Sequence, residues 1–128
     1  MSIQAQVLLA LQGLIDALGN YAAVVIGAQP AADGLVMAVS TGSTGAETLS
    51  LGGTVTLDVT LNAKHASQAT ALDTLCVIHE ALSRMEVLPY TEHWQMIAIR
   101  SAGAPGFVDH EGGQWLYGSA LAVEYAVV

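Results

Sequence analysis

The sequence predicts an α+β domain in which an antiparallel or mixed sheet carries two helices on one face, in the order helix, strands, helix, hairpin. Residues 3–18 and 67–85 carry apolar side chains at helical spacing, whereas residues 54–62 and 114–127 alternate apolar and polar positions. The strand-like segments are grouped rather than alternating with helices, which favours a sheet with its helices on one side. With 128 residues and no repeat or linker, the chain is predicted to be one domain, residues 1–128.

The first half of the chain is predicted to form a helix, two strands and a loop. Ser2 can cap an amphipathic helix over residues 3–18, and Gly19-Asn20 supplies its stop. Short strands are expected at 21–26 and 35–40. Residues 41–53 are rich in Gly, Ser and Thr and are expected to form a loop, with strand-like composition at 47–51. A loop of this length in a compact domain is either functional or a flexible hairpin tip.

The second half is predicted to contain the best strand, the second helix and the closing hairpin. Residues 54–62 alternate strictly, so one face is expected to be buried and the other to face water or a polar lumen. Ser67 can cap a helix over 67–85, whose apolar band includes Leu72, Leu75, Ile78, His79, Leu82 and Met85. A strand over 93–101, with Trp94, Met96 and Ala98 on one side, a turn region over 102–113 and a long strand over 114–127 complete the prediction.

The composition indicates a protein that associates with other protein chains. Hydrophobic residues make up 53% of the chain and charged residues 11%, against about 25% charged in a typical soluble domain. A surface so poor in ions is expected to be completed by sister subunits, because lasting interfaces resemble a core cut in half. The apolar runs are too short to span a membrane, and no Lys or Arg precedes the first one, so no signal peptide is expected.

The charged residues and the single cysteine argue against two further classes of protein, those that grip nucleic acid and those held by internal disulfides. The net charge is −8 and the only cations are Lys64, Arg84 and Arg100, too few to grip nucleic acid by neutralising its phosphates. Cys76 is the one cysteine, so no internal disulfide can form and a reducing compartment is the simple inference.

No stretch of the sequence carries a catalytic, nucleotide or metal signature. His79-Glu80 begins like the zinc protease motif, but Ser83 stands where the second histidine is needed. The glycine-rich run 42–45 lacks the lysine of a phosphate loop. Cys76 and His79 share a helix face, yet a buried cysteine beside a hydrogen-bonded histidine explains them without a metal. We therefore predict no cofactor, no metal and no enzymatic activity.

Two further groups are candidates for contacts. Asp109, His110 and Glu111 form the densest polar cluster, in a predicted turn flanked by glycines. They are either an exposed contact or weak cation site, or simply a solvated turn, which is the favoured interpretation. Trp94 and Trp115 fit interface anchors and core packing equally well.

Taken in order, these segments resemble the bacteriophage tail terminator and minor capsid protein family of head–tail joining proteins. The resemblance spans nearly the whole chain: an N-terminal amphipathic helix, an extended region with a Gly/Ser/Thr loop, a central helix and a closing hairpin. The end of the chain carries it best, where the turn 109–113 leads into Gln114-Trp115-Leu116-Tyr117-Gly118 and then Ala122-Val123-Glu124-Tyr125.

The resemblance implies a role in the virion, after assembly in the bacterial cytoplasm. Members form a hexameric ring that caps the tail tube and faces the head connector protein, while DNA passes through the hole without specific binding. The family has no catalytic residues to transfer. Residues proposed for the interface or the lumen are Glu47, Asp58, Asp109, Glu111, Trp94 and Trp115. Alternatives are a head-completion or tail tube subunit, a small binding module that uses the groove between helix and sheet, and an enzyme without a sequence signature.

Overall fold

A computed structural model describes residues 1–28, 32–39 and 54–128. Within them the elements are α1 (Ile3–Asp16), β1 (Val24–Ile26), β2 (Gly34–Val39), β3 (Thr54–His65), α2 (Gln68–Ser83), β4 (Trp94–Glu111) and β5 (Gln114–Val127). The predicted α+β class and the order helix, strands, helix, hairpin are confirmed. The predicted loop 41–53, with its glycine-rich run and Glu47, lies outside the described residues.

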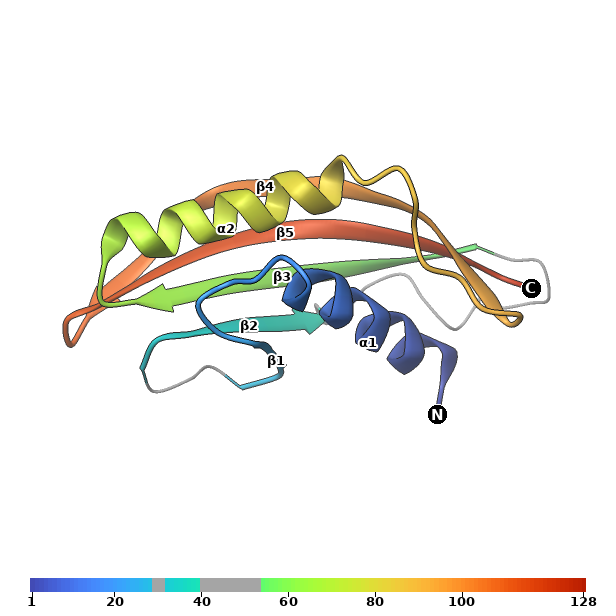
Figure 1. Cartoon of the computed structure of the whole chain (residues 1–128), viewed down its shortest axis with the longest axis horizontal. Coiled ribbons are helices and arrows are strands. Elements are labelled where there is room, and N and C mark those ends of the chain that lie inside the picture. The colour runs from blue at the N-terminus through green and yellow to red at the C-terminus, as the bar shows by residue number, and fades with distance from the viewer. Residues whose placement is uncertain (29–31, 40–53) are drawn as a thin grey trace.

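The strands form one five-stranded mixed sheet in the order β1-β2-β3-β5-β4 (Figure 1). β1 runs parallel to β2, and the other neighbouring strands are antiparallel. β3 and β5 lie side by side in the centre and pair from Thr54↔Ala126 to His65↔Trp115. The strict alternation along both strands therefore places every second side chain of this ladder on the same face.

Both helices lie on one face of this sheet, with α2 over β4 and β5 and α1 nearer β1 and β2 (Figure 1). The buried core forms between them and the inward side chains of the strands. Its largest fully buried members are Tyr125, Leu11, Ile15, Met37, Leu57, Leu75, Ile78, Leu82 and Leu121. Each such aliphatic side chain contributes about 1.5–3 kcal/mol on burial. Among the described residues, neither helix combines the length and apolarity that a membrane crossing requires.

Polar contacts from α1 and the following turn fix the position of β1. The Ser2 hydroxyl accepts the Ala5 N–H at 3.1 Å, which confirms the predicted cap. Farther along α1, Gln12 Nε2 donates to the Val24 carbonyl and Asp16 Oδ1 accepts the Val24 N–H, both at 2.8 Å. The two bonds hold the first residue of a strand of only three residues, which is too short to be stable alone.

Tyr21 ties the same turn to the middle of the sheet. Its hydroxyl donates toward the carbonyls of Gly34 and Lys64, each at 2.9 Å. Burial, with a smaller contribution from the negative charge of Asp33, raises the pKa of Tyr21 to about 12. The phenol therefore remains a donor at any ordinary pH.

The predicted turn region over 102–113 is wrong. β4 continues from Trp94 to Glu111, and only Gly112 and Gly113 form the turn, with φ values of +59° and +78°. Glycine, proline and small residues normally interrupt a strand, but β4 is the edge of the sheet and shifts register at four places along β5. An edge position tolerates Pro105, because the outer side needs no ladder hydrogen bond.

One of these irregularities also changes which side chains face the core. The pairing shifts between Met96 and Ala98, so Ile99 is buried and Ala98 is opposite Glu124. The predicted alternation, which grouped Ala98 with Trp94 and Met96 on one side of the strand, is therefore wrong beyond Met96. The predicted band of the second helix is also too broad, since Leu72 is exposed whereas Leu75, Ile78, His79 and Leu82 are buried.

Candidate functional site: the open face of the sheet and the hairpin end

The face of the sheet opposite the helices carries small, mostly uncharged side chains. The alternation of β3 sends Thr56, Asp58, Thr60 and Asn62 to this face, which we call the open face. Their register partners on β5 include Gly118, Ala120 and Ala122. A shallow depression of about 390 Å³ lies here, lined by Thr60, Asn62, Gly103, Ala104, Gly118, Ser119 and Ala120. The open face is therefore smooth at its centre and bears few bulky groups.

Charges on the open face are few and of mixed sign. Asp58 lies exposed in the middle of β3. Arg100 Nη1 of β4 is 3.6 Å from Glu124 Oε2 of β5. At the end of β3, Lys64 lines a second depression of about 190 Å³ together with Asp109 and Glu111. Both cations of this face thus have carboxylates near them, so the face offers phosphates no net positive surface.

Aromatic side chains gather at the end of the β4–β5 hairpin. The rings of His110 and Trp115 are stacked, with centroids 3.7 Å apart and an interplanar angle of 8°. Phe107 meets Trp115 and Tyr117 edge-on, at centroid distances of 6.2 and 5.9 Å. Phe107 is nevertheless 59% exposed. The cluster is therefore ordered by its own ring contacts but remains open to a partner.

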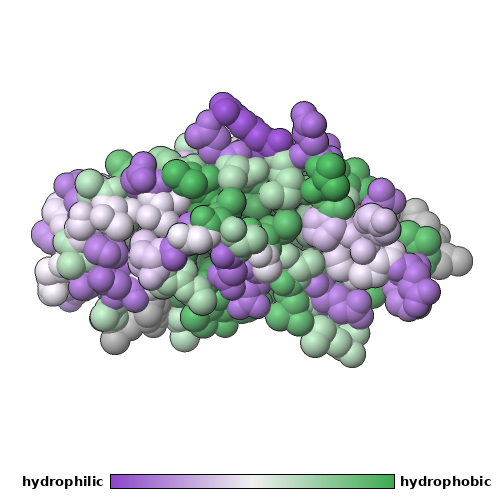
Figure 2. All heavy atoms as spheres, in the orientation of Figure 1, coloured by the Kyte–Doolittle hydropathy of each residue, from purple (hydrophilic) through white to green (hydrophobic). Residues whose placement is uncertain are grey.

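The end of the β4–β5 hairpin is anchored to α2, and its two sides carry different kinds of side chain. Gln68, the first residue of α2, donates from Nε2 to the Tyr117 hydroxyl at 2.8 Å. Asp109 and Glu111 pair with Leu116 and Gln114, whereas His110 pairs with Trp115. Because side chains alternate along a strand, the carboxylates lie on one side of the hairpin and the aromatic rings on the other. In Figure 2, hydrophilic residues predominate at this end, while hydrophobic ones reach the surface nearer the middle.

The structure places the predicted contact residues in different surroundings. Asp58 is exposed on the open face, and Asp109 and Glu111 are exposed at the end of β4 rather than in a turn. Trp94 is only 2% exposed and its Nε1 donates to Gln6 Oε1 at 3.1 Å, so core packing is the alternative that the structure supports. Trp115 is partly buried within the aromatic cluster. Their role at an interface or a lumen remains a prediction.

Sequence reasoning missed Phe107, because it fell within the predicted turn region. Only the continued pairing of β4 brings Phe107 opposite Tyr117 and close to Trp115. The pattern Phe-x-x-His on one segment and Trp-x-Tyr on the next was the available signal. This pattern brings the rings together only when β4 pairs with β5 in a register that includes the bulge between Phe107 and Asp109.

His79 holds α2 against the edge strand. Its Nε2 lies 2.8 Å from Ser101 Oγ of β4, and burial lowers the pKa of His79 below its ordinary value. Among the described residues, His79 Nδ1 is buried and has no hydrogen-bond partner. In the same part of the chain, no group of three or more His, Cys, Asp or Glu is placed to hold a metal ion.

Comparison with known proteins gives a match of fold. No family model matches the chain, and no curated protein matches it. Among solved structures, the chain is similar to one in a structure described as the virion of a native gene transfer agent (GTA) particle. The TM-score is 0.52 at 18% sequence identity, and the match covers 98% of this chain and 94% of that chain. The likeness therefore extends over the whole fold rather than one motif.

Proposed function

We propose that this chain is a non-enzymatic structural protein of a phage-like virion and acts there as a tail terminator. Copies would join in a ring, hexameric by resemblance to that family, which caps the tail tube and faces the head connector protein. The observation that carries the proposal is the similarity of fold, over 98% of this chain, to a chain of a GTA virion. The low content of charged residues, 11%, supports extensive contacts with other subunits.

Within such a ring, the open face is the best candidate for the lining of the central passage. The helices cover the opposite face, and the open face offers threonine, asparagine, alanine and glycine side chains that leave a smooth wall. Its cations lie beside carboxylates, and Asp58 adds negative charge near its middle. A wall of this kind repels phosphates weakly and does not retain DNA as it passes.

The oligomeric state of the purified chain tests the ring directly. Mass measurement in solution across a range of protein concentrations, followed by electron microscopy, should give a closed ring of fixed copy number. Open-ended stacks would favour a tail tube subunit instead. A stable monomer at every concentration would contradict the ring and favour a small binding module, which the exposed depression on the open face could serve.

A charge reversal on the open face tests separately whether this face lines the passage for DNA. In Asp58→Lys the new cation would face the passing DNA, so particles assembled with this variant should be less infective although the ring still forms. Asp73→Lys makes the same change of charge on α2, where the side chain is exposed on the helix-covered side. It should leave infectivity unchanged. Equal infectivity of the Asp58→Lys variant and the wild type would show that Asp58 does not face the DNA.

A further inference from the structure

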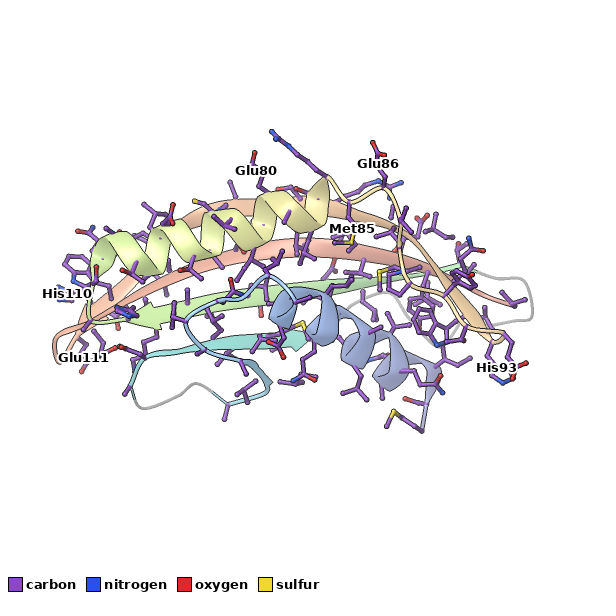
Figure 3. The ribbon with its side chains drawn as sticks, in the orientation of Figure 1. Glu80, Met85, Glu86, His93, His110 and Glu111 are labelled. Carbon is purple, nitrogen blue, oxygen red and sulfur yellow. The ribbon has the colours of Figure 1, made fainter. Side chains whose placement is uncertain are left out.

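The end of the β4–β5 hairpin has the features of a docking surface. We define it by Phe107, Asp109, His110, Glu111 and Trp115 and call it the hairpin end. It lies at one end of the long axis, where Figure 3 places His110 and Glu111, with His93 at the other end. Phe107 is 59% exposed and meets the rings of Trp115 and Tyr117 edge-on. Large aromatic side chains that are ordered and still accessible are the groups that most often dominate binding energy at interfaces.

The outer edge of the hairpin is accessible to another chain. Within the part of the chain that the structure describes, β4 is the last strand of the sheet and pairs only with β5 along this stretch. An incoming segment along that edge would meet rings on one side and the carboxylates of Asp109 and Glu111 on the other. The side chains that fit this arrangement are apolar on the first side and cationic on the second.

A second copy of this chain fits the hairpin end poorly, because it has little positive charge to offer. The sequence contains three Lys and Arg residues in all. Arg84 Nη1 lies 2.6 Å from Glu80 Oε1, and Arg100 Nη1 lies 3.6 Å from Glu124 Oε2. Lys64 lines the depression next to Asp109 and Glu111 of its own hairpin. Each cation of the chain therefore already has a carboxylate beside it.

Among the described residues, the most exposed pair of large apolar side chains on the connection between α2 and β4 repels the hairpin end rather than complementing it. Val87 is 84% and Tyr90 is 75% exposed. Both lie in the connection between α2 and β4, which also carries Glu86 and Glu92. Pairing this patch with the hairpin end of a second copy would bring carboxylates against carboxylates.

We propose that the hairpin end docks a segment of a different protein, in which cationic side chains alternate with apolar ones. The apolar side chains would cover Phe107 and Trp115, and the cations would face Asp109 and Glu111. This docking does not require the ring, since every residue that makes it belongs to one subunit.

The experiment uses the full-length chain, labelled with ¹⁵N, and a short synthetic peptide of alternating arginine and valine. The two indole N–H signals serve as reporters, because Trp115 belongs to the hairpin end and Trp94 is buried in the core. The peptide should shift the Trp115 signal and leave that of Trp94 in place. A peptide of alternating glutamate and valine is the matched control and should shift neither.

Variants then locate the binding. The double change Asp109→Asn with Glu111→Gln should weaken peptide affinity about 3- to 10-fold at low salt, as expected for two exposed charge pairs. Glu86→Gln with Glu92→Gln removes the same charge from the connection between α2 and β4 and should change affinity less than about twofold. Phe107→Ser should weaken binding about tenfold. Tyr90→Ser, which removes another exposed ring, should have no effect.

Three results of the peptide-binding experiments would overturn the proposal. They are equal binding of the acidic peptide, equal loss of affinity in the two double variants, and an unmoved Trp115 signal at saturating peptide. A fall in the mass of the assembled protein on Phe107→Ser would instead identify a second copy as the occupant and would also refute it. The carboxylate variants keep the test decisive if Phe107→Ser fails to fold.

Discussion

Among the glycines that the structure describes, Gly118 has the least room for a Cβ, and adding one methyl group there should destabilise the protein. A Cβ at Gly118 would lie 2.7 Å from Asn62 Oδ1 and 3.0 Å from Val108 Cγ2. Ordinary contacts begin near 3.4 Å, so Asn62 would have to move by about 0.7 Å and Val108 by about 0.4 Å. Overpacking of this kind costs about 1–3 kcal/mol. Both neighbours are side chains that can give way, so we expect about 1–2 kcal/mol for Gly118→Ala.

Gly103 provides a matched control on the neighbouring strand of the same face. A Cβ there would lie 3.4 Å from the Cβ of Ala120, which is an ordinary contact. Gly103→Ala should therefore be neutral or stabilise the fold by about 0.4–1 kcal/mol, because alanine restricts the unfolded chain. Urea denaturation of both variants at one protein concentration measures the difference. If Gly118→Ala were as stable as Gly103→Ala, the tight packing of β5 against Asn62 and Val108 would be refuted.

Three further predictions concern the core and the polar contacts. Because burial lowers the pKa of His79, the unfolded chain binds the proton more readily than the folded one, so stability should fall as pH drops below about 6.5. The variant His79→Gln should have a shallower decline in urea denaturation between pH 7 and 5, and an identical decline would contradict this role. Tyr21→Phe loses the hydrogen bonds to the Gly34 and Lys64 carbonyls and should cost about 1–3 kcal/mol in thermal or urea unfolding; an unchanged midpoint would mean that water replaces the phenol. Leu11→Ala leaves a cavity beneath α1, where Leu11 is fully buried, and should cost about 2–5 kcal/mol, whereas Leu9→Ala, at a position 44% exposed on the same helix, should cost much less.

The class of the fold and most of its elements were accessible from the sequence, because local periodicity records which face of each element is buried. The alternation of residues 54–62 identified β3, and the helical spacing of Val7, Leu11 and Ile15 identified α1 and its buried side. Ser2 and Ser67 were recognisable as caps, since their hydroxyls accept N–H groups three residues later. Each of these features depends on residues close together in the chain.

The extent of β4 could not be predicted in this way. Local conformational preference predicts a turn at Gly103, Pro105 and Gly106. They are accommodated in a strand because β4 is an edge whose inner side is held by pairing with β5 up to Glu111. That pairing depends on the whole length of β5, which follows in the sequence and already forms a ladder with β3.

The sequence by itself therefore determined three things. They are the kinds of side chain on the two faces of the sheet, the positions of the helices along the chain, and the scarcity of cations. Only the tertiary structure decided that Phe107, His110 and Trp115 form one cluster, and that Lys64 lies beside Asp109 and Glu111. The physical reason is that these contacts join separate strands through a register that includes bulges. Register is fixed by pairing over the full length of the strands and not by the preference of any one segment.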